Sequence, residues 1–402
     1  MPQTGPLSAL TEEQTGGRGR PANEGSTTVE NPPRTPAPRS VAPPRPAAEA
    51  PAPPAATAEA HASEATDTDA DRETEQPSAS ADVAGVLPPP SPVTGRLASR
   101  SHTTAVVTQE LAHRTTDRDV FPTRWTRISG NRFRFIADWP ADHPFFGPVD
   151  DRHQDPMVVG ETLRQASMVL AHAEFGAPAD THFVMRDMTV HVDPAALLLA
   201  DAAEPVEFDV VCSEVRRRGR GLHSMRTTME FRRAGRLVAH GTGSTGCTSP
   251  RAYRRLRADR SNAVDRPVPL LAGIAPHTAG RTRAEDVVLA PGDRPGVWNL
   301  RVDTGHPVLF PRPNDHVPGM VLFEAARQAA TAASGLHPFL PNRMTAGFTR
   351  YTELHSPCRV ETAVLDDGSG EVTVRVSGRQ DGESVFTASL TSARPARVPS
   401  QP

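Results

Sequence analysis

Three polar side chains interrupt an otherwise apolar stretch, "HVPGMVLFEAARQAA" at residues 316–330. Glu324, Arg327 and Gln328 stand at positions i, i+3 and i+4, so in a helix they share one face. A carboxylate can accept a proton, and a guanidinium binds an anion such as phosphate through two parallel hydrogen bonds. An amide can orient either group. The spacing therefore predicts acid–base chemistry next to an anion.

The same triplet occurs a second time, as Glu161, Arg164 and Gln165. With an offset of 163 residues, positions 143–194 align with 306–357 without a gap, and 13 of 52 residues are identical. Identical residues cluster around the two triplets. We interpret the folded region as two copies of one unit.

Structural explanations compete with this functional one. A solvated i, i+3 ion pair contributes only about 0.2–0.5 kcal/mol and is common by chance. A buried structural ion pair is the main alternative. We favour a functional role because the residues flanking Glu324 leave no other polar face, and because the triplet recurs at the same place in both copies.

Histidines precede both triplets. His153 and His316 lie eight residues before the glutamates, and His143 and His306 begin the same loops. Either acid–base chemistry or hydrogen bonds that order the loop would explain them. Their spacing does not match a zinc site, so we expect no metal.

Each copy has the same order of predicted elements. A short strand and a His-Pro loop lead into a helix, at Pro156–Phe175 in copy one and Gly319–Ser334 in copy two. Asp155 and Pro156 suit the cap and first position of a helix. Alternating patterns then predict antiparallel strands. These are "HFVMRDMTVHV", "VEFDVVCSEV", "HSMRTTMEF" and "RLVAHGT" in copy one and "RVETAVL", "EVTVRVSG" and "SVFTASLTS" in copy two. This is an α+β layout.

The chain divides by composition. Residues 1–105 contain many of its 42 prolines and no aromatic residue before position 100, which predicts a disordered tail. We assign 106–250 to the first unit, 251–283 to a linker, 284–395 to the second unit and 396–402 to a second tail. The chain has no charged start followed by an apolar run, so we expect no signal peptide.

Several classes of protein are not supported. No run of about 18 apolar residues predicts a membrane span, and a net charge of −3 gives no argument for nucleic acid. Three widely spaced cysteines favour a reducing cytoplasm. The 44 basic residues are all arginine, which excludes Schiff-base lysine chemistry.

The motifs resemble a known family. A Pro-Gly turn before a helix bearing Glu and Gln is similar to hotdog dehydratases that act on acyl-carrier-protein substrates, although Phe310 stands where those enzymes place a histidine. The stretches "HRTTDRDVF", "HPFFGP", "DPMVVGETLRQASMVLAHAEFG", "NDHVPGMVLFEAARQAA" and "GCTSPRAYRRLR" more closely resemble the A-factor synthase family of γ-butyrolactone biosynthesis. The resemblance covers roughly residues 110–395.

The resemblance implies a tandem hotdog fold, a pseudo-dimer within one chain in which a sheet wraps each long helix. It also implies an acyltransferase that moves a β-ketoacyl group from an acyl-carrier-protein thioester to a hydroxyl of dihydroxyacetone phosphate. No metal or redox cofactor is implied. Higher oligomers are left open.

For this reaction we expect Glu324 and Arg327 to form the main reacting site, with Glu161 and Arg164 serving the paired site or the phosphate. The glutamates are the candidate bases and the arginines the candidate phosphate ligands. The remaining candidates bind substrate: N–H groups at the helix start stabilise the thioester oxygen, and the other side chains orient it. They are Gly319, Met320, Gln328, Gln165, His316 and His153.

Other functions and two further motifs need weighing. Hydrolysis or dehydration of an acyl thioester, and non-enzymatic binding of an acyl chain or lactone, are the alternatives. "GTGSTG" at 241–246 matches a dinucleotide-binding motif but ends an antiparallel run, which argues against a βαβ unit. The basic turn "EVRRRGRG" at 214–221 is either a solvated hairpin or a docking patch for the acidic carrier protein.

Overall fold

The computed structural model describes residues 103–219, 221–366 and 368–394. The predicted disordered tails lie outside this part of the chain, except that residues 104 and 105 begin strand β1. No helix within the described residues is long and apolar enough to span a membrane.

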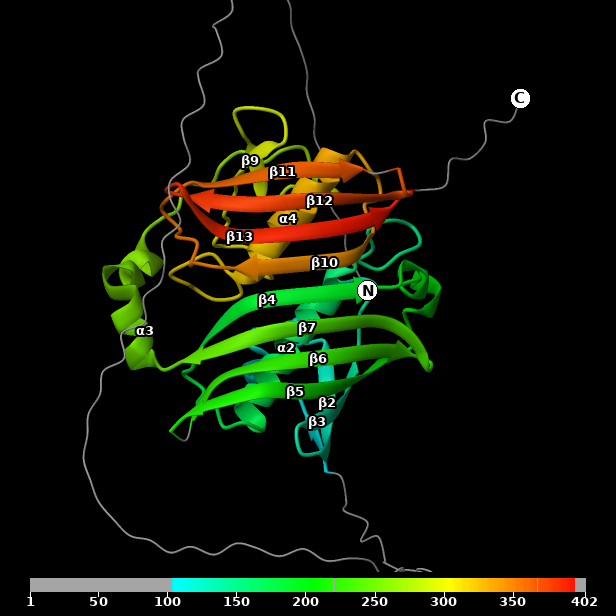
Figure 1. The fold of residues 1–402 in the computed structure, drawn as a ribbon, viewed down its shortest axis with the longest axis vertical. Coiled ribbons are helices and arrows are strands. Elements are labelled where there is room, and N and C mark those ends of the chain that lie inside the picture. The colour runs from blue at the N-terminus through cyan, green and yellow to red at the C-terminus, as the bar shows by residue number, and fades with distance from the viewer. Residues whose placement is uncertain (1–102, 220, 367, 395–402) are drawn as a thin grey trace, which may run out of the picture. The chain divides into compact units, whose positions relative to one another are not determined.

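The described residues form two halves, each with one long helix and one set of antiparallel strands (Figure 1). The first half contains β1 (Thr104–Val106), α1 (Gln109–Ala112), η1 (Asp117–Asp119), β2 (Pro122–Ser129), β3 (Arg132–Ala137), α2 (Met157–Ala173), β4 (His182–Val192), η2 (Pro194–Ala196), η3 (Leu199–Asp201), β5 (Val206–Arg218), β6 (Gly221–Arg233) and β7 (Arg236–Thr248). A connecting segment contains α3 (Pro250–Arg257), η4 (Ala258–Asp265) and η5 (Pro276–Ala279). The second half contains β8 (Leu289–Pro291), β9 (Val297–Leu300), α4 (Gly319–Ser334), β10 (Pro341–Phe348), β11 (Cys358–Asp366), β12 (Glu371–Gln380) and β13 (Glu383–Ala393).

The strands join into one 13-stranded sheet in the order β1-β2-β3-β5-β6-β7-β4-β10-β13-β12-β11-β9-β8. The halves meet at the antiparallel pair β4–β10, where Thr189 lies opposite Thr345. The α+β tandem hotdog prediction is confirmed. Strand β10 was not predicted, because its sequence "PNRMTAGF" lacks a regular alternation of apolar and polar residues.

The two long helices are buried because the sheet covers them. They also contact each other: a Cβ atom at Gly160 of α2 would lie 3.2 Å from the Phe323 ring of α4. Helix α4 has the predicted limits, whereas α2 runs from Met157 to Ala173, three residues shorter than predicted. These helices bring both polar triplets into the interior.

The "GTGSTG" stretch lies inside strand β7, which pairs antiparallel with β4 and β6, so it is not the turn of a βαβ unit. Its glycines have a packing role instead. A Cβ atom at Gly241 would lie 2.6 Å from Leu163 Cδ1 of α2, which is closer than van der Waals contact permits. Glycine therefore allows the helix to approach the sheet.

We expect Gly241→Ala to destabilise the protein by about 1–3 kcal/mol, the usual cost of adding atoms to a packed core. Thermal denaturation followed by circular dichroism measures this. Gly347→Ala is the control, because the nearest atom to its Cβ would be 3.7 Å away, an ordinary contact. Equal melting temperatures for both variants would contradict the packing explanation.

Candidate active site

The first triplet forms a closed ionic cluster around Glu161, which is completely buried. Its carboxylate accepts hydrogen bonds from Arg164 Nη2 at 2.7 Å and Nε at 3.0 Å. Gln165 Nε2 donates at 2.7 Å, and Arg114 Nε donates at 3.0 Å. One carboxylate thus binds two guanidinium groups.

The second triplet repeats this arrangement around Glu324, also completely buried. Arg327 donates from Nη2 at 2.7 Å and from Nε at 2.9 Å, and Gln328 Nε2 donates at 2.6 Å. The second guanidinium comes from Arg281, whose Nε lies 2.8 Å from Glu324 Oε1. Arg281 falls in the segment that the sequence analysis assigned to the linker.

Arg114 and Arg281 were not predicted as site residues, yet they connect the two halves in a reciprocal way. Arg114 Nη1 of the first half donates to the carbonyl of Val308 in the second at 2.6 Å. Arg281 Nη1 donates to the carbonyl of Phe145 in the first half at 2.6 Å. Phe145 and Val308 are equivalent in the repeat, so each site is built from both halves.

The same symmetry fixes the two amides. Gln165 Oε1 accepts from the Phe121 N–H at 3.0 Å, and Gln328 Oε1 accepts from the Val288 N–H at 2.9 Å. In each amide the oxygen accepts from this backbone N–H, and the nitrogen donates to the glutamate. Gln165 and Gln328 are thus hydrogen-bonded to the glutamates, and they line none of the three pockets found.

The glutamates are strongly acidic in this setting. Burial raises the pKa of Glu161, but the charges of Arg114 and Arg164 lower this pKa by a larger amount, so that it falls to about 2. Burial likewise raises the pKa of Glu324, and Arg281 and Arg327 lower it to about 2. A carboxylate this acidic, with its oxygens already hydrogen-bonded, is a weak base. These contacts favour positioning of the arginines over the general-base role expected from the sequence.

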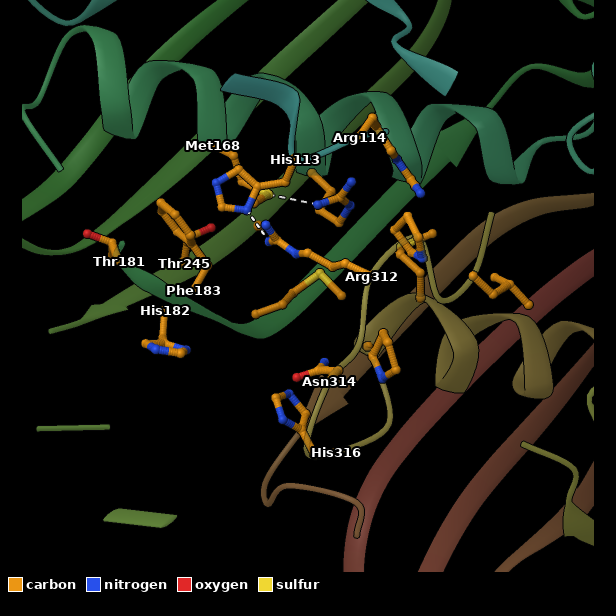
Figure 2. Close-up of a pocket in the computed structure, with 18 of the residues that line it drawn as sticks. His113, Arg114, Met168, Thr181, His182, Phe183, Thr245, Arg312, Asn314 and His316 are labelled. Atoms are coloured by element: carbon orange, nitrogen blue, oxygen red, sulfur yellow. Dashed lines mark hydrogen bonds between the residues drawn. The ribbon is translucent and has the colours of Figure 1, made fainter. Parts of the chain in front are cut away.

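A large pocket of about 620 Å³ lies where the halves meet, and it receives the first cluster (Figure 2). Arg114 and Arg164 line it from the first half. Its wall also includes apolar side chains from both halves: Leu163, Met168, Phe183, Met185, Val308, Leu309 and Met320. The pocket thus combines a cationic end with an apolar wall.

A third guanidinium, Arg312, enters the large pocket from the second half and was not predicted. Figure 2 shows its side chain extending toward His113. Burial and the charges of Arg164 and Arg114 lower the pKa of Arg312, so the three guanidiniums repel one another. Glu161 binds two of the three guanidiniums, and Asp180 and Asp187 also line the pocket. The three neighbouring guanidiniums form a local cluster of positive charge that suits a dianion.

His113 positions Arg312. Burial, with the charges of Arg312 and Arg164, lowers the pKa of His113 to about 3, so the ring is neutral. His172 Nδ1 must donate to the Ala177 carbonyl, 2.8 Å away. Its Nε2 then accepts from His113 Nε2 at 2.8 Å, which leaves His113 Nδ1 to accept from Arg312. The chain of contacts fixes both tautomers.

The start of helix α4 is open toward the large pocket. Gly319 and Met320 line the pocket, and neither backbone N–H has a hydrogen-bond acceptor among the described residues. The equivalent start of α2 is closed, because Asp155 Oδ1 accepts from the Met157 N–H at 2.9 Å. The residue equivalent to Asp155 is Pro318, which has no side-chain acceptor. Only the α4 start offers free N–H groups to a ligand, among these two helices.

His316 lies in the wall of the same pocket and forms a dyad with Asp315. His316 Nδ1 is 2.7 Å from Asp315 Oδ1, and Tyr253 donates its hydroxyl to the same oxygen at 2.5 Å. The other carboxylate oxygen accepts from Arg257 Nε at 3.0 Å. If Nδ1 donates to Asp315, then Nε2 is an acceptor, and it has no partner among the described residues.

The other histidines have ordering contacts. His153 Nδ1 pairs with Asp150 at 2.9 Å, and His153 does not line the large pocket. His143 Nδ1 accepts from the N–H groups of Phe145 and Phe146, and His306 Nδ1 accepts from the equivalent N–H groups of its own loop. These contacts match the loop-ordering alternative given above.

The second cluster borders a smaller pocket of about 350 Å³, lined by Arg281 and Arg327. Here Asp155 Oδ2 lies 3.4 Å from Arg281 Nη1, so two carboxylates face two guanidiniums. The residue equivalent to Arg312 is Val149. The smaller pocket therefore lacks both the excess positive charge and the open helix start.

Comparison with known proteins agrees with this architecture. The family model described as "A-factor biosynthesis hotdog domain" matches residues 97–249 and 263–394. The chain belongs to the A-factor biosynthesis hotdog family. In this family member the two matched segments each contain one polar triplet.

Relatives named 2-oxo-3-(phosphooxy)propyl 3-oxoalkanoate synthase include a Streptomyces coelicolor protein, 45% identical over 73% of this chain and 93% of the relative. A Streptomyces virginiae protein is 44% identical over 71% of this chain and 96% of its own. A Streptomyces griseus protein is 42% identical over 77% of this chain and 98% of its own length. The similarity thus spans nearly the whole length of each relative.

Proposed function

We propose that this protein is an acyltransferase that joins a β-ketoacyl group, delivered as a thioester, to the hydroxyl of dihydroxyacetone phosphate in A-factor-type signal biosynthesis. The name of the relatives describes this product: a 3-oxoalkanoate esterified to a 2-oxo-3-(phosphooxy)propyl group. The observation that carries the proposal is the large pocket, in which three guanidiniums and an open helix start lie beside an apolar wall.

The phosphate would bind the guanidiniums of Arg114, Arg164 and Arg312. Glu161 neutralises one of the three charges, and a phosphate dianion neutralises the other two. Burial of Arg114 and the fixed tautomer of His113 support this role, because both hold a cation in place before the ligand arrives. Preorganised charges of this kind lower the cost of binding.

The thioester carbonyl would lie at the start of α4. As the substrate hydroxyl attacks this carbon, its oxygen becomes anionic, and the N–H groups of Gly319 and Met320 are free to stabilise it. His316 Nε2 would take the proton of the attacking hydroxyl, while Asp315 orients the ring. The new C–O bond forms, the C–S bond breaks, and His316 returns the proton to the departing thiolate.

This proposal moves the main reacting site from Glu324 and Arg327 to the large pocket. Glu324 and Arg327 would then stabilise the equivalent but closed site of the second cluster. Support comes from the Asp155 side chain, which occupies the start of α2 and approaches Arg281.

Mass spectrometry tests the function. The protein is incubated with a β-ketoacyl thioester, with and without dihydroxyacetone phosphate. We expect a phosphorylated ester only when the acceptor is present. Free acid formed at the same rate in both reactions would support a thioesterase instead, a dehydrated acyl product a dehydratase, and the absence of turnover a binding protein.

We expect Arg312→Gln to raise the KM for dihydroxyacetone phosphate by about tenfold to a hundredfold, since a hydrogen bond to a charged group contributes about 1.5–3 kcal/mol. Steady-state kinetics with varied acceptor measure this effect. The KM for the thioester should change little. Arg343→Gln, an exposed arginine of β10 that lines none of the pockets described, is the control. Equal KM values for both variants would remove Arg312 from the phosphate site.

We also propose that the donor is an acyl carrier protein and that the protein works in the cytoplasm. The apolar wall of the large pocket suits the acyl chain. Cys212, Cys247 and Cys358 are free thiols, which is typical of a reducing compartment.

A further inference from the structure

Helix α3 presents a basic surface next to the large pocket. Arg251, Arg254 and Arg255 stand at positions i, i+3 and i+4 and are exposed. No acidic side chain of the described residues forms an ion pair with any of the three. Arg254 and Arg255 stand in the last turn, where the helix dipole favours cations, whereas Arg251 stands in the first turn, where it does not. Stability alone therefore does not account for all three arginines on one face.

The opposite face of α3 is fixed to the rim of the large pocket. Tyr253 and Pro250 both line this pocket. Tyr253 also donates its hydroxyl to Asp315, and Arg257 binds Asp315 and Glu353. These contacts hold the helix beside the pocket, while Arg251, Arg254 and Arg255 are exposed to solvent.

Exposed apolar side chains accompany these arginines. Leu256 is 63% exposed, and Val264 of η4, which packs against α3, is 41% exposed. A surface that combines arginines with isolated apolar side chains is typical of transient protein interfaces. A small anion would gain nothing from contact with the apolar Leu256 side chain, so the composition of this surface favours a protein partner.

We propose that the exposed face of α3 is the docking site for an acidic helix of the carrier protein that presents the acyl thioester. This inference rests on the proposed function and adds to it the surface that receives the donor. Docking on α3 would place the flexible prosthetic group of the carrier protein, which bears the acyl thioester, at the rim of the large pocket formed by Pro250 and Tyr253. This group would then reach the α4 start from the side of the pocket that α3 borders.

The test compares two donors in the intact protein, a β-ketoacyl carrier-protein thioester and the same acyl group on N-acetylcysteamine. We expect Arg251→Glu/Arg255→Glu to raise the KM for the carrier-protein donor by about fivefold or more at low salt, with kcat nearly unchanged. Added salt should raise the KM of the wild-type protein more than that of the variant. The kcat/KM for the small thioester should stay at the wild-type value, because it needs no docking surface.

Two further pairs make the test specific. Arg124→Glu/Arg132→Glu, exposed arginines of β2 and β3 away from the pocket lining, should leave both donors unaffected. Arg216→Glu/Arg218→Glu tests the basic turn identified in the sequence. An unchanged carrier-protein KM for the α3 variant would overturn the inference, as would an effect confined to the Arg216 and Arg218 pair. Failure of the wild-type protein to use either donor would instead overturn the proposed function.

Discussion

We expect His316→Gln to lower kcat for acyl transfer by about 10²–10⁴-fold, the usual range for loss of a general base. His316 is the histidine of the large pocket whose Nδ1 is held by a carboxylate, at 2.7 Å from Asp315. Glutamine keeps a polar side chain of similar length but cannot accept a proton. The KM for dihydroxyacetone phosphate should change little, because in the proposed site the phosphate would contact arginines and not this ring.

His153→Gln is the matched control, since it removes the equivalent histidine of the first copy. His153 also pairs with an aspartate, Asp150, but lies outside the large pocket. We expect its kcat to stay within a few-fold of wild type. Equal losses in both variants would indicate that these histidines only order their loops.

The internal repeat predicted much of the fold because helix and strand patterns are local. The limits of α4 followed from Pro318, Gly319 and a continuous apolar run. The alignment stopped at His143, however, and so missed Arg114 and Arg281. These two arginines align at an offset of 167 residues, against 163 for the rest, because the intervening loops differ in length by four residues. A search that allowed one gap would have paired "HRTTDRDV" with "GRTRAEDV".

The difference between the two sites was harder to predict. The triplets are chemically identical, and only the apolar residues that flank Glu324 favoured the second copy as the main reacting site. What separates them lies outside the triplets: Arg312 against Val149, and Pro318 against Asp155. Each of these residues acts across the boundary between halves, and only the three-dimensional arrangement shows which cluster it joins. The open α4 start lines the same pocket as Arg114 and Arg164 of the first cluster, although Glu324 is closer to it in the sequence.

We expect Glu324→Gln to destabilise the protein by about 3–5 kcal/mol, the usual cost of removing one partner from a buried ion pair. Arg281 and Arg327 would remain buried without their carboxylate, and Arg327 is only 2% exposed. Glu161→Gln should cost less, because Arg164 is 20% exposed and borders the large pocket, where water and ions reach it. Chemical denaturation of both variants measures the difference. Similar losses would contradict this account of the second cluster.

Acid unfolding gives an independent measure of how much the ion pairs of Glu324 stabilise the protein. The pKa of Glu324 is about 2 in the folded protein, below its ordinary value of 4.5. Its contribution to stability is therefore complete above about pH 4.5 and is lost as the pH falls through 2. Glu324→Gln lacks this group, so its stability should fall less steeply than that of the wild-type protein over this range.

Activity then decides the role of Glu324. A folded Glu324→Gln protein that transfers acyl groups at the wild-type rate identifies it as structural, whereas a folded but inactive one restores it as the reacting base expected from the sequence.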